Sequence, residues 1–103
     1  MNIQTDLADK LPSLSSLCEE HSVEKMYAFG SVCSDEFTPQ SDVDLLVTFK
    51  DSLSIDAYAD NYFSFKEKLE SLLKRHVDLI IERTLRNPYL IKAINKTKTL
   101  IYA

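Results

Sequence analysis

The chain has 103 residues, of which 45% are hydrophobic and 27% charged, as in an ordinary globular protein. This length predicts one domain over residues 1–103, and the absence of any run of about 18 apolar residues argues against a membrane span. The net charge of −4 disfavours nucleic acid as a partner, because nonspecific binding to it depends on basic patches.

Periodicity predicts alternating helices and strands. Leucines at near-helical spacing between residues 7 and 17 predict an amphipathic helix ending near residue 21, which starts or breaks at Pro12. The other patterns predict a strand over 23–29, a short helix over 31–37, a turn over 38–41, a strand over 43–49, a helix over roughly 54–74, a strand over 77–81 and a helix over 87–94. Residues 99–102 add a short strand or simply pack down. The fold class is therefore α/β (α+β), with a small mixed β-sheet flanked by helices.

The cysteines and histidines form no metal-binding pattern. Cys18 and Cys33 fit no zinc spacing and no disulfide framework, and the N-terminus lacks the features of a signal peptide. We therefore expect free thiols and a cytoplasmic location. His21 and His76 have no partner at ligand spacing and are predicted at the surface or at strand ends.

Three aspartates in apolar surroundings predict a cation site. Asp42 and Asp44 are two residues apart, so their side chains lie on one face of the predicted strand. Carboxylates about 5 Å apart repel by roughly 3 kcal/mol at an effective dielectric near 20, and a divalent cation removes that cost. Asp78, in another apolar strand, would complete a three-acid site. Three acids suit two Mg²⁺ ions about 3.5–4 Å apart, an arrangement typical of phosphoryl transfer.

Gly30 and Ser31 fit the phosphate side of the same chemistry. Gly30 is the only glycine of the chain, and a glycine lets the backbone approach a phosphate closely and adopt positive φ. Ser31 supplies a hydroxyl and a backbone N–H at the start of the predicted short helix, where an anion is favoured.

These motifs resemble a known family. Gly30-Ser31, ten intervening residues and Asp42-Val43-Asp44 resemble the Gly-Ser-x₁₀-Asp-x-Asp signature of the minimal nucleotidyltransferases, members of the DNA polymerase β-like nucleotidyltransferase superfamily. Asp78 is similar to the third carboxylate of that family. The order of predicted elements agrees over nearly the whole chain.

The resemblance implies a Mg²⁺-dependent nucleotidyltransferase that transfers a nucleoside monophosphate, AMP from ATP, to a hydroxyl. By carry-over, Asp42 and Asp44 would hold two Mg²⁺ ions. Asp78 would bind the catalytic ion and help deprotonate the acceptor. Gly30 and Ser31 would contact the β and γ phosphates.

The resemblance also implies a partner. Similar stand-alone domains are antitoxins of two-gene modules, in which they adenylylate a tyrosine hydroxyl of a HEPN-domain RNase toxin, so a hetero-oligomer is expected. Family members often carry Arg-Ala-Arg-Gly after the Gly-Ser pair, whereas this chain has Val32-Cys33-Ser34-Asp35. Lys50 and Arg75 are candidates to replace the missing arginines on the triphosphate. The alternative is a catalytically weak binding module that inhibits the HEPN partner by direct contact.

Overall fold

The computed structural model describes residues 5–33 and 41–103, so residues 34–40 of the expected short helix and turn lie outside it. Four strands form one sheet: β1 (Val23–Phe29), β2 (Val43–Phe49), β3 (Val77–Ile81) and β4 (Thr99–Tyr102). Their order is β3-β2-β1-β4. β2 and β3 are parallel, whereas β1 pairs antiparallel with both β2 and β4. The expected mixed sheet is confirmed, and the C-terminal segment forms its fourth strand.

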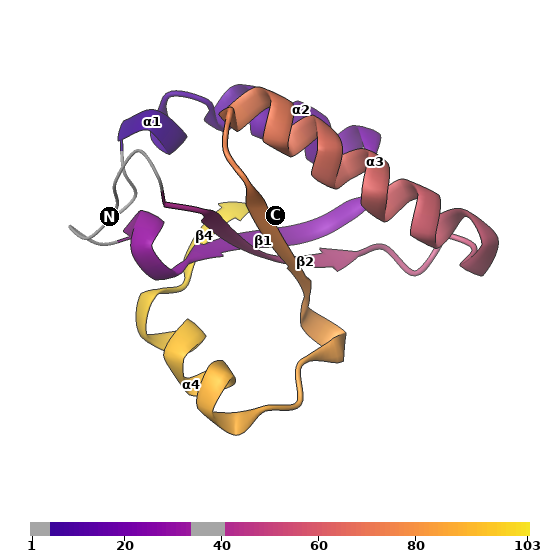
Figure 1. Ribbon diagram of the computed structural model, residues 1–103. Coiled ribbons are helices and arrows are strands. Elements are labelled where there is room, and N and C mark those ends of the chain that lie inside the picture. The colour runs from indigo at the N-terminus through magenta and orange to yellow at the C-terminus, as the bar shows by residue number, and fades with distance from the viewer. Residues whose placement is uncertain (1–4, 34–40) are drawn as a thin grey trace.

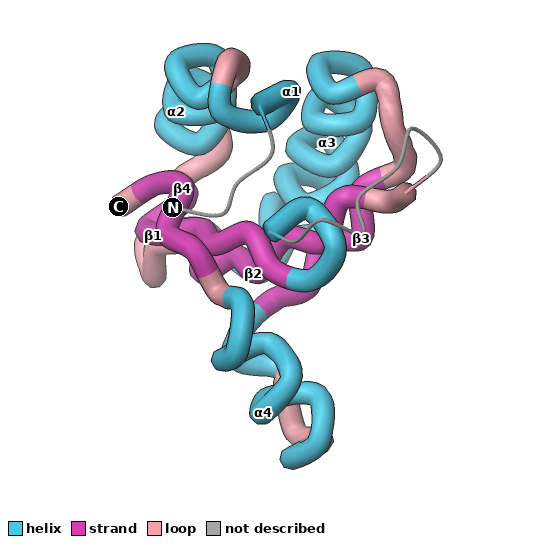
Figure 2. Tube along the Cα trace, turned by 90° about the vertical axis from the view of Figure 1, so that its left-hand side faces the viewer, coloured by secondary structure: helices cyan, strands magenta, loops and turns pink. Residues whose placement is uncertain are grey.

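Helices cover the two faces of this sheet unequally. The short helix α1 (Thr5–Ala8), α2 (Leu11–Glu20) and the long α3 (Ile55–Leu73) lie on one side, and α4 (Pro88–Thr97) lies on the other (Figures 1 and 2). Two 3₁₀ turns, η1 (Gly30–Cys33) and η2 (Glu82–Thr84), follow β1 and β3. None of the helices in the described ranges is long and apolar enough to cross a membrane.

The main core fills the space between the sheet and the pair α2 and α3. Alternation along β2 sends Val43, Leu45 and Val47 into this core, where the fully buried Phe65 of α3 meets them. Under α4 there is a smaller cluster, in which Leu46 of β2 packs with Phe29 and Ile94. The α4 side of the sheet is thus only thinly covered, and it is the side to which residues 44 and 78 point.

The predicted start or break at Pro12 is confirmed, because the chain breaks at residues 9–10 and Pro12 occupies the first turn of α2. The structure corrects two other details of the sequence prediction. α4 continues to Thr97, three residues beyond the predicted end. His21 is not at the surface: it is 5% exposed, and its Nδ1 lies 2.8 Å from the Leu17 carbonyl oxygen.

Both cysteines are free and buried, as expected for a chain without a disulfide framework. Burial raises the pKa of the Cys18 thiol to about 12, because the thiolate would lose its hydration in the core. Cys18 therefore acts as a small apolar core residue.

A cap residue sets the start of α4 and supplies the first testable prediction. The Asn87 side chain accepts hydrogen bonds from the backbone N–H groups of Tyr89 and Leu90. Asn87→Ala should lower the free energy of unfolding by about 1 kcal/mol, because those N–H groups lose their partner. Urea unfolding measures this change. Asn95→Ala, at an exposed position within the same helix, is the matched control and should cost nothing, so equal losses in both variants would contradict the assignment.

Candidate active site on the α4 face of the sheet

Asp44 occupies the centre of the candidate site. It lies in β2 between two neighbouring strands, opposite Phe29 of β1 and opposite Asp78 of the parallel strand β3. Directly opposed residues on neighbouring strands place their side chains on the same face, about 5 Å apart at Cβ. The sheet register therefore brings both the Gly-Ser turn after β1 and Asp78 of β3 next to the Asp44 carboxylate.

Gly30 lies against that carboxylate. Its φ is +75°, a conformation that L side chains rarely adopt, and a Cβ placed on it would come within 2.6 Å of Asp44 Oδ2. The Gly30 N–H donates a 2.9 Å hydrogen bond to the Thr97 hydroxyl at the end of α4. A glycine is thus required here for two separate reasons, its backbone angle and the closeness of Asp44.

Burial and like charges both raise the pKa of the Asp44 carboxyl group. The largest cause is the loss of hydration, followed by the negative charge of Asp78 and then by that of Asp42. The charge of Asp78 also adds to desolvation in raising the pKa of the Tyr62 hydroxyl, which donates a 2.6 Å hydrogen bond to the Leu79 carbonyl. The negative charges of the three acids therefore act on one another, and a cation would reduce their repulsion.

The side chains differ in exposure and do not yet form a coordinating group. Asp42 and Asp78 are exposed and Asp44 is half-buried. Among the described residues, no three His, Cys, Asp or Glu side chains are gathered closely enough to hold a metal ion together. The chemistry of the donors nevertheless fits Mg²⁺, because carboxylate oxygens are its preferred protein ligands and the opposed pair Asp44 and Asp78 repels without a cation.

Neighbouring groups fix the backbone at this end of the sheet. Arg75 donates from Nη1 to the Ser41 carbonyl oxygen at 3.1 Å, directly before Asp42, and the Val43 N–H donates to the His76 carbonyl at 3.1 Å. Arg75 thus lies at the acid end. Thr97 was not expected at the site, because no motif marks a threonine at the end of a distant helix.

The Gly-Ser turn, which is predicted to bind phosphate, is described only in part. Ser31 belongs to the turn η1 and directly follows Gly30, the residue that lies against Asp44. Cys33 ends the turn and is buried. Residues 34–40, which include Ser34 and Asp35 of the departure from the family pattern, lie outside the described part of the chain.

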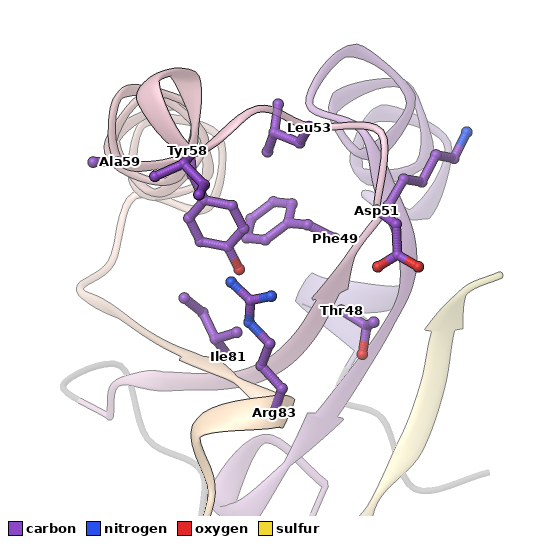
Figure 3. A pocket seen from close by; sticks show the side chains of 10 residues that line it. Thr48, Phe49, Asp51, Leu53, Tyr58, Ala59, Ile81 and Arg83 are labelled. Atoms are coloured by element: carbon purple, nitrogen blue, oxygen red, sulfur yellow. The ribbon is translucent and has the colours of Figure 1, made fainter.

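A separate pocket of about 570 Å³ opens at the other end of β2 (Figure 3). Phe49, Tyr58 and Ile81 form its apolar wall, and the Arg83 guanidinium lies 4.9 Å from the centre of the Tyr58 ring. Lys50 also lines it. Lys50 is six residues beyond Asp44, about 20 Å along a strand, so it is poorly placed to replace a phosphate-binding arginine at the acids.

Comparison with known proteins assigns the family. Residues 13–101 match the model of the nucleotidyltransferase domain family, so the chain belongs to that family and is a nucleotidyltransferase. A protein of Methanocaldococcus jannaschii, provisionally named a protein adenylyltransferase, is 36% identical over 86 residues, which cover 84% of this chain and 82% of the relative. The family resemblance seen in the sequence is confirmed.

Solved structures agree with this assignment. A structure described provisionally as a minimal nucleotidyltransferase superposes with a TM-score of 0.72 at 31% identity, covering 90% of each chain. The complex of a tri-AMPylated HEPN toxin with an MNT antitoxin from Shewanella oneidensis gives a TM-score of 0.64 at 20% identity, over 93% of this chain and 71% of the other. At that identity the second likeness shows the fold alone.

The raised pKa of Asp44 leads to a prediction about stability. A carboxyl whose folded-state pKa is raised stabilises the fold at low pH and loses that contribution as the pH rises through the folded-state pKa. Without a cation at pH 7, Asp44→Asn should therefore raise the melting temperature by roughly 2–4 °C, which corresponds to about half a kcal/mol for a partly hydrated group. The gain should shrink as the pH falls towards 4.

Calorimetry over pH 4–8 measures this effect, with Asp60→Asn, at an exposed position of α3, as the control. Mg²⁺ should stabilise the wild type more than Asp44→Asn. If Asp44→Asn were less stable than the wild type at pH 7 without metal, the ionised Asp44 carboxylate would not destabilise the metal-free fold, contrary to this prediction.

Gly30→Ala tests the contact with Asp44. The substitution should destabilise the fold by about 1 kcal/mol from positive φ alone, with a further cost from displacing the carboxylate. In the background of Asp44→Ala only the first cost should remain. Thermal unfolding of the four proteins in this cycle gives the coupling, and additive effects would show that the two residues do not touch.

Proposed function

We propose that this protein transfers AMP from ATP, with Mg²⁺, to a hydroxyl group of a partner protein, and that the partner is a HEPN-domain toxin. The observation that carries the proposal is the position of Asp44, which lies against Gly30 and opposite Asp78. The names of the relatives support an adenylyl group as the one transferred. The HEPN toxin in the complex of similar fold supports the choice of acceptor.

In this proposal the acceptor oxygen forms a bond to the α-phosphorus of ATP, the α–β phosphoanhydride bond breaks, and pyrophosphate leaves. Asp42 and Asp44 would hold the Mg²⁺ ions, and Asp78 would share one of them and receive the proton of the acceptor hydroxyl. When bound, the ions supply charge neutralisation on the phosphates. Gly30 and Ser31 would present backbone N–H groups and a hydroxyl to the β and γ phosphates.

The alternative is a module of the same fold that blocks its partner by contact without turnover. The specific observation in its favour is the sequence Val32-Cys33-Ser34-Asp35, which lacks the arginines typical after the Gly-Ser pair and adds an acid. Arg75 could compensate in part for the missing arginines, because it lies beside Ser41 at the end of the sheet that carries the acids.

Transfer of radiolabel from α-labelled ATP to a HEPN-domain RNase co-expressed with this chain tests the proposal. Labelling should require Mg²⁺, and the double variant Asp42→Ala with Asp44→Ala should reduce it at least about 1,000-fold, because the ligands of both ions are lost. Asp56→Ala with Asp60→Ala removes two exposed acids of α3 and is the matched control. It should label as the wild type does.

Neutralisation of the RNase by the wild type without any labelling would overturn the transferase proposal and favour the contact alternative. The circular dichroism spectrum of the double variant should match that of the wild type. A loss of labelling can then be assigned to the missing carboxylates and not to unfolding.

A further inference from the structure

The charges of this chain are strongly segregated. Residues 83–103 contain five basic residues and no Asp or Glu, whereas the preceding 82 residues contain all 16 acids and only seven of the 12 basic residues. The basic segment consists of η2 from Arg83 on, α4 and β4. Among the described elements, α4 is the one with a net positive charge, and it lies on one side of the sheet (Figures 1 and 2). Strand alternation sends the opposed pair Asp44 and Asp78 to the same side, with Leu46 of the cluster under α4.

Some basic side chains of this segment already interact with other groups of the chain, and others do not. Lys98 lies over the Tyr27 ring at 4.7 Å, and Arg86 donates to the carbonyl oxygens of Arg83 and Leu85 at 2.8 Å. Lys92 and Lys96 are exposed and, among the described residues, neither has an ion-pair partner.

These two lysines share one face of α4 with an aromatic ring. Tyr89, Lys92 and Lys96 are spaced three and four residues apart, so they form one stripe along the helix. Tyr89 is 84% exposed, and Ile94, on the opposite face, is 2% exposed and packs on the sheet. The outer face of α4, defined by Tyr89, Lys92 and Lys96, is therefore both cationic and apolar. A large ring so exposed is typical of a binding surface.

The position of this face relative to the aspartates is fixed. The last residue of α4, Thr97, accepts the hydrogen bond from Gly30, which itself lies against Asp44. Tyr89 is eight residues before Thr97, about 12 Å along a helix. A molecule on the outer face of α4 thus lies within reach of the acids, and its position is set by the Gly30–Thr97 contact.

We infer that the outer face of α4 docks an acidic segment of the acceptor protein. Carboxylates of that segment pair with Lys92 and Lys96, and an apolar side chain packs on Tyr89. Charge complementarity selects this partner, because these lysines have no ion-pair partner among the described residues of a protein whose net charge is −4. The inference rests on the proposed function and adds a recognition surface that orients the acceptor hydroxyl towards Asp78.

Two other occupants fit less well. An RNA strand would bring phosphates to the side of the sheet that holds three aspartates, and it would meet an overall acidic protein. A second copy of this chain could present its own acidic part to α4, and this would appear as concentration-dependent dimerisation. Both are outcomes of the experiment below.

The experiment compares the wild type with the double variant Lys92→Glu and Lys96→Glu. Isothermal titration with the HEPN-domain RNase of the transfer assay, at 50 and 300 mM NaCl, should give at least about tenfold weaker binding for the variant and a smaller salt dependence. In the transfer assay the KM for the acceptor should rise by a similar factor with kcat nearly unchanged. Tyr89→Ala should weaken binding without altering the salt dependence.

The matched control is Lys68→Glu with Lys74→Glu, which changes the net charge equally at two exposed lysines of α3 and its C-terminus. The control should bind and transfer as the wild type does. Equal affinity of the wild type and the α4 variant, equal losses in both double variants, or no binding by the wild type would each overturn the inference.

Two further results would also overturn it: tighter, Lys92-dependent binding of a single-stranded RNA oligonucleotide than of the protein, or a dimer that the α4 variant abolishes in sedimentation. Lysine-dependent and salt-dependent binding of the acceptor without any AMP transfer would instead leave the docking surface standing and remove the proposed function.

Discussion

The constraint on which the rest of the structure depends is the position of one carboxylate, that of Asp44. It lies in a central strand with the backbone of Gly30 against its oxygen and another acid opposite it in register. Burial and two like charges raise its pKa, so the ionised group opposes folding when no cation is present. A strand residue serving stability alone would be apolar here, as Leu46 is on the same face. The acid fits the proposed Mg²⁺ site, because a bound cation would remove this cost.

The unequal helical layers on the two faces of the sheet explain why the fold can accommodate the acids. The core between the sheet and the pair α2 and α3 holds most of the buried apolar side chains, and the fully buried Phe65 and Leu69 contribute from α3. The opposite face carries only a small cluster under α4. Asp42 and Asp78 consequently remain hydrated, and only Asp44 is partly desolvated. Most of the apolar core thus lies on one side of the sheet and the candidate site on the other, and the alternation of side chains along β2 separates the two.

Local sequence patterns predicted the bounds of most helices and strands, but they could not predict contacts between segments that are distant in the sequence. The bounds of β1, β2 and β3 follow from dense apolar runs, and the common face of Asp42 and Asp44 follows from strand alternation. The parallel register of Asp44 with Asp78 depends on the crossover through α3, which no local pattern fixes. The hydrogen bond of Gly30 with Thr97 spans 67 residues, and the burial of His21 depends on packing against the Phe65 ring, 5.1 Å away.

The charge distribution connects the fold to its proposed partner. Under the proposed function an acidic site accepts ATP and an acidic acceptor, and it would repel both if the whole surface had one sign. Lys92 and Lys96 lie on the outer face of α4 without an ion-pair partner among the described residues, so they would attract the acceptor without neutralising the aspartates. Ion pairs between α4 and the three acids would instead fill the positions that the cations need. The segregation of charge along the chain is thus compatible with a site that keeps its aspartates free for metal while a separate face holds the acceptor.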